Sequence, residues 1–515
     1  MAFESNAQAH PPLSGTSLVI GTLALSLATF MNVLDTSIAN VSIPAISGDL
    51  GVSPDQGTWI ITSFGVANAI SLPLTGWLSQ RIGQVRLFTI SVLLFVLSSL
   101  LCGLAPSFEV LLFARIVQGA VAGPMIPLSQ TLLLSSYPPK MAGTALGMWA
   151  ITTLVAPVVG PLLGGWITDN MSWPWIFYIN VPVGLLASFV TWSVYKKRES
   201  PKRQLPIDKV GLTLMVIWIG ALQIMFDKGK DLDWFNSPLI IGLAITAVVG
   251  FSLFLVWELT ETHPVVALQL FANRNFWTGT LSLSLAYAAF FGNLVLLPLW
   301  LQQYMGYTAT QAGMALAPVG ILAFLLTPLI GRYSARFDPR ILATIAFVIF
   351  AIVLWMRGEF NTQANFETII VPTIIQGAAV ACFFIPLTSL TLSGLPPASL
   401  PAATGLTNFV RITAGSFGTS IATTLWASRA SIHHEELIKN LSPYSPVTNL
   451  TLHQLSATGI SIPQQANLMN LIVDQQAYTM AATDLFRGSA ILFLVLVALI
   501  WLAKPVKLSV SEHSK

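Results

Sequence analysis

Long apolar runs recur along almost the whole chain and constrain its fold more than any other feature. A run of about 20 mostly apolar residues is long enough to cross a lipid bilayer as an α-helix. The sequence predicts fourteen such spans, so the solvent for most of the chain is lipid. They are expected at 17–39, 57–79, 87–105, 109–134, 143–167, 175–195, 210–226, 238–258, 276–301, 311–331, 340–356, 367–392, 403–427 and 485–503.

Composition supports an all-α membrane protein. Only 9% of the 515 residues are charged, against about 25% in soluble proteins. The net charge of +3 is spread over short loops, which argues against nucleic-acid binding. No cleavable signal is recognised, so the first apolar run is interpreted as a retained span. Cys102 and Cys382 are expected to be buried small side chains rather than a disulfide or a metal site.

The Lys and Arg residues fall mainly on alternate loops. One set of loops carries Arg81, Arg86 and the basic stretch 196–209. Cytoplasmic loops are enriched in such residues, so both termini are predicted in the cytoplasm. The opposite set of loops carries Lys228, Lys230, Arg357, Arg429 and Lys439.

An internal repeat divides the spans into two sets of six. Leu25–Ala28 recurs as Leu283–Ala286, and Gln118 and Gly119 recur as Gln376 and Gly377, always at a separation of 258 residues. Repeats with the same orientation build one large class of transporters. The predicted division is a cytoplasmic N-terminus at 1–16, a six-span bundle at 17–195, a linker and two inserted spans at 196–275, a second six-span bundle at 276–503 that includes a periplasmic loop at 428–484, and a tail at 504–515.

Five motifs occur in the order expected of a known family. They are Gly76–Arg86 after span 2, Arg115–Gly119 in span 4, Gly160–Gly165 in span 5, Leu34–Pro44 in span 1 and Trp173–Pro182 at the start of span 6. In these five motifs the chain resembles the major facilitator superfamily, and within it the fourteen-span drug:proton antiporters. The resemblance implies a fold of 14 transmembrane helices, namely two six-helix bundles plus an inserted helix pair.

Two further stretches narrow the resemblance. Gln56–Ile70 and Gly123–Gln130 resemble the EmrB-type subgroup, whose members are the inner-membrane pumps of tripartite multidrug efflux systems. That resemblance implies a periplasmic membrane-fusion adaptor protein and an outer-membrane channel as partners. It implies no cofactor, because the proton motive force drives transport.

Gating residues are expected in the loop after span 2 and in span 5. The loop positions that match the family motif are Arg81, Gly83 and Arg86, whereas Gln80 replaces the usual Asp. Glycines allow helices to approach closely in lipid, and proline removes a backbone donor. Span 5 is therefore predicted to form a rocking seam between the halves through Gly160, Pro161, Gly164 and Gly165. The alternative is that these residues only provide tight packing.

Asp35 and Arg115 are the predicted proton-coupling residues. A charge within the membrane costs roughly 2.5–3.5 kcal/mol on insertion scales, so such residues are functional candidates. Asp35 lies roughly 25 Å along its span from the inside, and Arg115 roughly 10 Å along its span from the outside. Both therefore fall in the outer half of the bilayer. The alternative is a static structural ion pair.

The repeat predicts that the two halves are chemically unequal. At the offset of 258 residues, Asp35 corresponds to Asn293 and Arg115 to Thr373, while Arg411 corresponds to Thr153. Proton coupling is thus expected in the first half. Arg411, interpreted as a lone cation in the second half, is expected to attract anionic groups of the substrate.

A mixed apolar cavity is expected to bind substrate, since Met and aromatic side chains suit promiscuous binding. For any one aromatic residue, lipid exposure or core packing is an equally good interpretation. The predicted lining is Phe30, Gln118, Met125, Tyr287, Phe291, Asn293, Asn408 and Arg411.

The long polar stretch at 428–484 is predicted to contain a helix at Gln464–Thr479. The resemblance implies that this loop docks the adaptor, and the alternative is a solvated connector. No metal site is predicted, because adjacent side chains such as His433 and His434 point in different directions on a helix.

The sequence therefore predicts a proton-coupled antiporter that exports hydrophobic drugs or toxic amphiphiles. The alternative is a facilitator for one defined metabolite such as a fatty acid. No nucleophile elbow, phosphate loop or metal cluster supports an enzyme. No filter-like repeat supports a channel.

Overall fold

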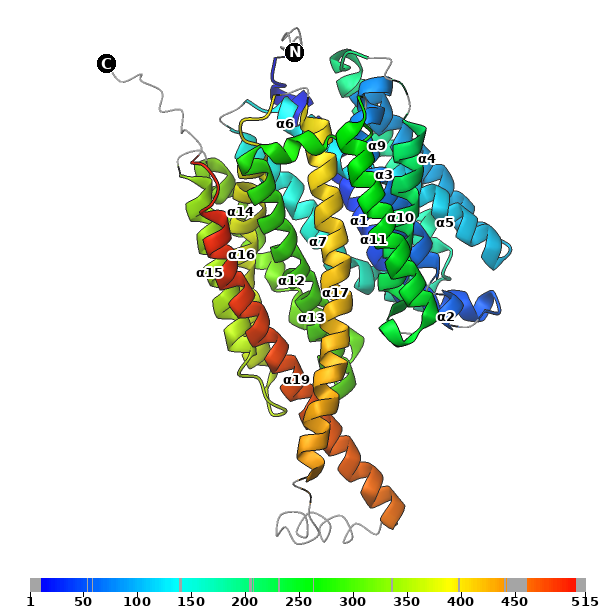
Figure 1. The fold of residues 1–515 in the computed structure, drawn as a ribbon, viewed down its shortest axis with the longest axis vertical. Helices are drawn as coiled ribbons and strands as arrows, with labels where there is room; N and C mark the ends of the chain where they lie inside the picture. Colours follow the sequence, from blue (N-terminus) through cyan, green and yellow to red (C-terminus); the bar gives the residue numbers. More distant parts are fainter. Residues whose placement is uncertain are drawn as a thin grey trace.

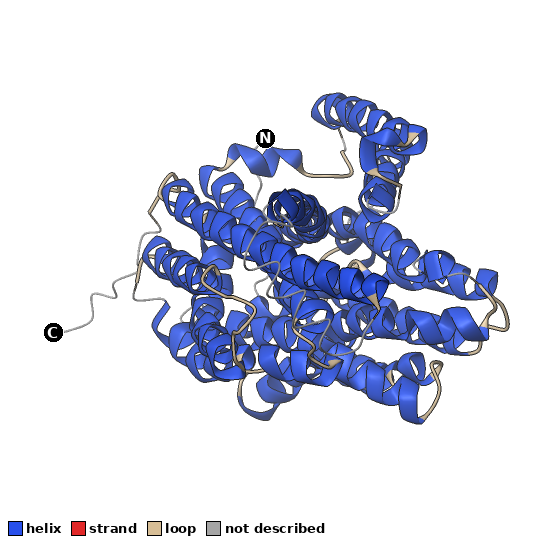
Figure 2. Cartoon of the chain, turned by 90° about the horizontal axis from the view of Figure 1, so that it is seen from below, coloured by secondary structure: helices blue, strands red, loops and turns tan. Residues whose placement is uncertain are grey.

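The structure is a computed structural model that describes residues 11–52, 54–57, 59–138, 141–202, 206, 208–229, 232–262, 264–334, 337–396, 399–439, 441 and 461–505. Within these ranges the chain is helical and contains no strand, as Figure 2 shows in a view along the bundle. The all-α prediction is confirmed. Among the described residues, twelve helices are long and apolar enough to cross a membrane.

The helices of the first half occupy the six spans predicted there. They are α1 (Gly15–Asp49), α2 (Pro54–Gly57), α3 (Trp59–Ile82), α4 (Gln84–Gly103), α5 (Phe108–Ala122), α6 (Met125–Ser136), α7 (Ala142–Asn170), α8 (Trp175–Tyr178) and α9 (Asn180–Tyr195). The span predicted at 109–134 is divided into α5 and α6 at Gly123 and Pro124, where proline cannot supply the backbone donor that a continuous helix needs.

The inserted pair and the second half follow. The pair is α10 (Lys209–Gly229) and α11 (Pro238–Thr260), and the second half is α12 (Arg274–Tyr304), α13 (Ala309–Leu316), α14 (Val319–Tyr333), α15 (Pro339–Arg357), α16 (Phe366–Leu392), α17 (Leu400–Lys439) and α19 (Ile462–Ile500). Helices α7 and α17 occupy two of the fourteen predicted spans but are not among the twelve apolar ones. The count of fourteen stays a prediction.

Corresponding helices make corresponding contacts in the two halves. Helix α1 packs on α7 and α9, and α12 packs on α17 and α19. Helix α10 packs on α11 and on α3, so the inserted pair lies beside the first half and also contacts α17 (Figure 1).

One end of the bundle, which we call the basic end, holds the loop after α3, the end of α9 and the start of α15. The first and last described segments lie there, since Leu13 N donates to Ser136 O at 2.8 Å and Lys504 N donates to Asn275 Oδ1 at 2.7 Å. The opposite side is called the far end.

The halves contact each other closely toward the basic end. A Cβ atom added to Gly76 would lie 2.8 Å from Ala402 Cα, and one added to Gly143 would overlap Gly331 O. Gly147 lies similarly close to Thr327. These glycines bring α3 against α17 and α7 against α14, so the bundle is closed at the basic end.

In this structure two glycines of the predicted seam in span 5 pack within the first half, and the gating role of span 5 stays a prediction. A Cβ atom at Gly160 would lie 2.5 Å from Ser37 Oγ, and one at Gly164 would lie 2.9 Å from Ile38 O. Both glycines therefore bring α7 against α1 within the first half, not against the second half. Gly165 is partly exposed, and the side chain of Pro161 lies outside the described residues.

Helices α17 and α19 extend beyond the rest of the bundle at the far end (Figure 1). They contain 40 and 39 residues, which is about 60 Å of helix against about 30 Å of bilayer core. Trp426 Nε1 donates to Tyr478 O at 2.9 Å where the two helices meet. The predicted helix at Gln464–Thr479 is part of α19, which begins with a capping box at Ser461.

Candidate functional site

A buried polar cluster in the first half contains both predicted proton-coupling residues. Arg115 Nη1 on α5 donates to Asp35 Oδ2 on α1 at 2.6 Å. Gln118 Nε2 and Asn180 Nδ2 donate to Asp35 Oδ1 at 3.1 and 2.9 Å. Asp35, Arg115 and Gln118 are fully buried, and Asn180 is 1% exposed. Three helices thus hold one carboxylate by three donors.

The guanidinium of Arg115 is also fixed by its surroundings. Its Nε donates to Ile60 O at 3.0 Å, and its Cζ lies 4.3 Å from the centre of the Phe64 ring. Arg115 Nη2 and Asn180 Oδ1 are buried without a hydrogen-bond partner. A buried polar atom without a hydrogen-bond partner is destabilising, so two polar atoms of the cluster are unsatisfied in this conformation.

The hydrogen bonds of Asp35 join three helices of the first half. The ion pair joins α1 to α5, and Asn180 joins both to α9. Loss of the charge on Asp35 would leave Arg115 as a buried guanidinium without its counterion, which is strongly unfavourable. Such a change would favour any conformation in which Arg115 reaches water or another anion.

At the position that corresponds to Asp35, the second half carries an uncharged amide. Asn293, the counterpart of Asp35, donates from Nδ2 to Ala289 O at 2.7 Å and to Ser489 Oγ at 3.0 Å. Gln376, the counterpart of Gln118, accepts at 2.7 Å from Arg357 Nη2, which also donates to Thr373 Oγ1 at 3.2 Å.

The location predicted for Arg357, in a loop facing water, is wrong. Arg357 is the last residue of α15 and is 1% exposed. It lies 258 residues after Ser99, on the helix before α16. In the second half the arginine that donates to Gln376 therefore comes from the preceding helix. In the first half Arg115, which donates to Gln118, lies on the same helix as Gln118. The repeat offset was the signal that would have found it. Arg411 is consequently not the lone buried cation of the second half.

Arg411 lies in an aromatic enclosure to which both halves contribute. Its Cζ is 4.8 Å from the ring centre of Tyr287, 5.5 Å from that of Trp149 and 5.6 Å from that of Phe384. Its Nη2 donates to Asn408 Oδ1 at 2.6 Å. In the described part of the chain no carboxylate pairs with Arg411, so an anionic group would be stabilised beside it.

The predicted substrate residues fall into separate places. Tyr287, Asn408 and Arg411 belong to the aromatic enclosure, and the Phe291 ring packs on that of Tyr287 at a tilt of 31°, with ring centres 4.3 Å apart. Gln118 belongs to the Asp35 cluster instead. Met125 is fully buried in the core, Phe30 is half-buried, and Asn293 faces α19.

The loop after α3 has a carboxylate that the sequence motif lacks. Glu199, which follows α9, accepts from Val85 N at 3.1 Å and from Arg86 N at 2.9 Å at the start of α4. Arg86 Nε lies 4.0 Å from it. Gly83 has φ +100°, a left-handed conformation that suits glycine. Arg81 lies over the Trp77 ring at 5.2 Å. Glu199 thus supplies the negative charge that Gln80 does not.

These features define a multi-pass α-helical membrane protein built from two related helix bundles around buried charged groups. The chain belongs to the Major Facilitator Superfamily, whose family model matches residues 25–419. It is 51% identical to the multidrug export protein EmrB of Haemophilus influenzae over 97% of this chain and 98% of that protein. It is also 51% identical to EmrB of Escherichia coli strain K12 over 97% and 98%, and 49% identical to the fatty acid resistance protein FarB of Neisseria gonorrhoeae over 96% and 98%.

Solved structures show the same fold at low identity. The human organic anion transporter MFSD10 superposes with a TM-score of 0.56 at 13% identity, covering 95% of this chain and 100% of that one. A bacterial homologue of the lysosomal transporter Spinster gives a TM-score of 0.52 at 16% identity, covering 95% and 97%.

Proposed function

We propose that this protein is a proton-coupled antiporter that exports hydrophobic drugs or toxic amphiphiles across a bacterial inner membrane. The observation that carries the proposal is the fully buried pair of Asp35 and Arg115, joined at 2.6 Å between α1 and α5. The names of relatives at about half identity support multidrug export. No cofactor is needed, since the proton gradient supplies the energy.

The proposed mechanism is competition between substrate and proton. Substrate binding at the aromatic enclosure draws the halves into a new packing, and this releases the proton from Asp35. Opening at the far end then lets a proton return to Asp35 as substrate leaves. Arg411 would favour substrates with an anionic or electron-rich group, because it lies 4.8 Å from Tyr287 with no carboxylate partner among the described residues.

The decisive experiment replaces Asp35 in purified protein reconstituted into vesicles. Asp35→Asn keeps the shape and one hydrogen-bond acceptor but removes the charge, so substrate flux driven by an imposed pH gradient is expected to fall to background. Asp233→Asn is the matched control, because Asp233 lies in an exposed loop and, among the described residues, its side chain accepts from Asn236 alone. Full proton-driven flux in Asp35→Asn would eliminate the coupling role.

A facilitator for one defined metabolite is the second candidate. The name of the relative FarB, a fatty acid resistance protein, favours a fatty acid as that metabolite. The two candidates differ in range. Proton-driven flux of several unrelated hydrophobic compounds supports multidrug export, whereas flux of fatty acids alone supports the second candidate.

The projecting arm, formed by α17 from residue 428 and α19 up to residue 484, is the proposed dock for a periplasmic adaptor that reaches an outer-membrane channel. The arm exposes apolar side chains, with Leu471 62% and Ile438 47% exposed. Residues 442–460 of the predicted loop lie outside the described residues.

Leu471→Glu tests the docking proposal. It should abolish co-purification of a co-expressed membrane-fusion adaptor, because a charge would replace exposed apolar surface on the arm. Asn467→Glu adds the same charge at an exposed polar position and should leave co-purification intact. Equal adaptor recovery from both variants would argue for a solvated connector.

A further inference from the structure

Helix α1 carries a row of three buried polar residues that bond in turn to α5 and α6. Thr29, Asn32 and Asp35 are three residues apart and at most 1% exposed. Asp35 pairs with α5, and Asn32 Nδ2 donates at 3.1 Å to the O atom of Ala122, the last residue of α5. Thr29 Oγ1 donates to Ser129 Oγ on α6 at 2.8 Å. All three residues lie within one unbroken helix, so a shift of α1 at Asp35 also moves Thr29.

The hydroxyl group of Ser129 joins three helices. It accepts from Thr29 Oγ1 and, at 3.2 Å, from Trp149 Nε1 on α7, and it donates to Ile126 O at 2.7 Å. A serine hydroxyl has one hydrogen to donate and two lone pairs to accept with, so its capacity is fully used. Thr29 has a second acceptor in its own helix, Leu25 O at 2.9 Å. A shift of α1 would therefore leave Ser129 free to turn, and the acceptor of Trp149 would no longer be fixed.

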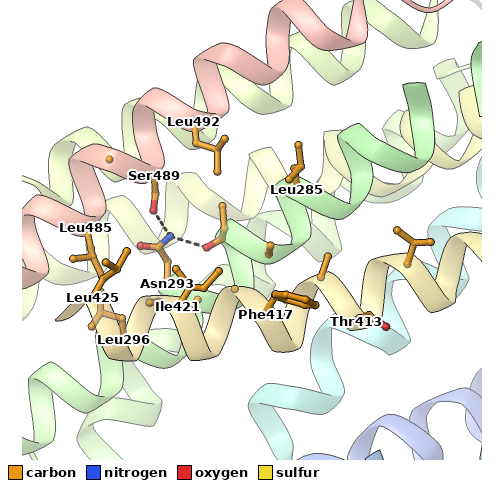
Figure 3. Close-up of a pocket in the computed structure, with 18 of the residues that line it drawn as sticks. Leu285, Asn293, Leu296, Thr413, Phe417, Ile421, Leu425, Leu485, Ser489 and Leu492 are labelled. Carbon is orange, nitrogen blue, oxygen red and sulfur yellow. Dashed lines mark hydrogen bonds between the residues drawn. The ribbon is translucent and has the colours of Figure 1, made fainter. Parts of the chain in front are cut away.

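The other side of Trp149 contacts the second half. The side chain is 2% exposed, and its ring centre lies 5.5 Å from Arg411 Cζ on α17. A guanidinium within about 6 Å of an indole ring is attracted to its face. Arg411 lies on the side of α17 toward the first half, whereas Thr413 and Phe417 line a separate cavity between α12, α17 and α19 (Figure 3). Trp149 thus contacts the α1 network through its N–H and the enclosure through its ring.

A neighbouring contact between the halves lacks the link to α1. Gln130 follows Ser129 on α6, and its Oε1 accepts from Asn408 Nδ2 at 3.2 Å. In the described part of the chain the side chain of Gln130 bonds to Asn408 and makes no bond to α1. That contact holds the halves together without responding directly to the position of α1. Trp149 meets both requirements.

We propose that Trp149 is a positioning residue that couples the Asp35 cluster to the Arg411 enclosure. The inference rests on the proposed function and names how its two sites act on each other. When Asp35 is neutral, α1 shifts, Thr29 leaves Ser129, and the indole ring loses the acceptor that holds it beside Arg411. Substrate binding at the enclosure is then weaker. Coupling between two binding sites is reciprocal, so bound substrate in turn favours release of the proton from Asp35.

A double-mutant cycle on the purified full-length protein tests this coupling. The probe is the aromatic anion anilinonaphthalene sulfonate, followed by fluorescence, and only the binding that Arg411→Leu removes is counted. Asp35→Asn should raise the apparent Kd at least about fivefold, as loss of one buried hydrogen bond allows. In Trp149→Phe, which keeps an aromatic ring but has no N–H, Asp35→Asn should raise the Kd less than about twofold. Lost packing alone would change the Kd equally with and without the charge on Asp35.

Two further variants make the test specific. Ser129→Ala removes the acceptor of the indole and should abolish the coupling as Trp149→Phe does. Trp166→Phe makes the same substitution at a position of α7 that is 59% exposed and should keep the fivefold effect. An undiminished effect of Asp35→Asn in Trp149→Phe and Ser129→Ala would overturn the role of Trp149 alone. If Asp35→Asn leaves the Kd unchanged in the otherwise unaltered protein, or if no binding depends on Arg411, the competition mechanism is wrong and this inference with it.

Discussion

At the scale of single residues, the buried carboxylate of Asp35 is stabilised by a small number of hydrogen-bond donors. Asp35 accepts from Arg115, Gln118 and Asn180, and Asn180 also donates to Ser99 Oγ at 3.0 Å. Each donor comes from a helix that must be in place, so the cluster reports on the packing of α1, α5 and α9 together.

Removal of the Asn180 donor should destabilise the protein. Asn180→Leu leaves one Asp35 oxygen and Ser99 with fewer partners in a buried place, at a cost of about 1–3 kcal/mol, and should lower the midpoint of thermal unfolding in detergent. Asn170→Leu is the control, because Asn170 is exposed and bonds only to Trp166 O in its own helix. Equal midpoints for both variants would contradict the role of Asn180.

Arg115 and Arg357, which are both buried, should respond differently to replacement by methionine. Arg115→Met leaves Asp35 ionised and unpaired, which should cost about 3–5 kcal/mol. Arg357→Met removes a buried cation that has no carboxylate partner among the described residues, so the unfolding midpoint should be unchanged or higher. Thermal unfolding of both purified variants checks this. Equal destabilisation of the two variants would contradict the prediction that only the loss of Arg115 leaves an unpaired buried charge.

The residue scale also shows what the sequence could predict. Two opposite charges within apolar runs at similar depths were enough to predict that Asp35 and Arg115 lie close together. Asn180 was not predicted as part of the site although it lies in the motif Trp173–Pro182. An amide in a membrane helix can bond to its own backbone, to another helix or to a site, and the sequence does not distinguish these. Arg357 was missed because it is the last residue of a span, where a charged side chain reaches water as readily as it turns inward.

At the scale of helices, close packing through glycines sets where the halves contact. Spacing predicted that small residues would bring helices together, but it could not say which helix lies opposite. Gly160 and Gly164 contact α1 in the same half, whereas Gly143 and Gly147 contact α14 across the molecule. Only the tertiary structure distinguishes a seam inside a half from one between halves.

A methyl group at the seam between halves should open the basic end. In Gly143→Ala the new Cβ would overlap the backbone oxygen of Gly331, so α7 and α14 must separate. A cysteine introduced as Thr327→Cys should then react faster with a thiol reagent. Cys102 and Cys382 are buried and give a low background. Gly320→Ala, at a place with nothing within 4 Å, should leave the rate unchanged.

At the scale of the whole molecule, contacts between the halves gather toward the basic end. Thr131 on α6 and Thr404 on α17 have their Oγ1 atoms 3.1 Å apart, one from each half. Gln130 and Asn408 meet at 3.2 Å one turn nearer the centre. The structure therefore represents a state closed at the basic end, which transport must undo.

A reversible crosslink should stop the cycle in this state. Thr131→Cys combined with Thr404→Cys places two thiols within reach of a disulfide, and oxidation should reduce export to background while reductant restores it. Thr131→Cys alone should be insensitive to oxidant. Undiminished export by the oxidised double variant would show that this contact does not open during transport.

Helix α17 runs without a break from the seam at the basic end to the tip of the arm at Lys439. A helix of about 60 Å behaves as a stiff rod. Any tilt at Gly405, where α17 contacts Leu72 and Thr75, therefore swings the tip outside the membrane through a larger arc. The arm is mechanically a lever: whatever is attached to it would be moved by each transport stroke, without a separate signal passing between them.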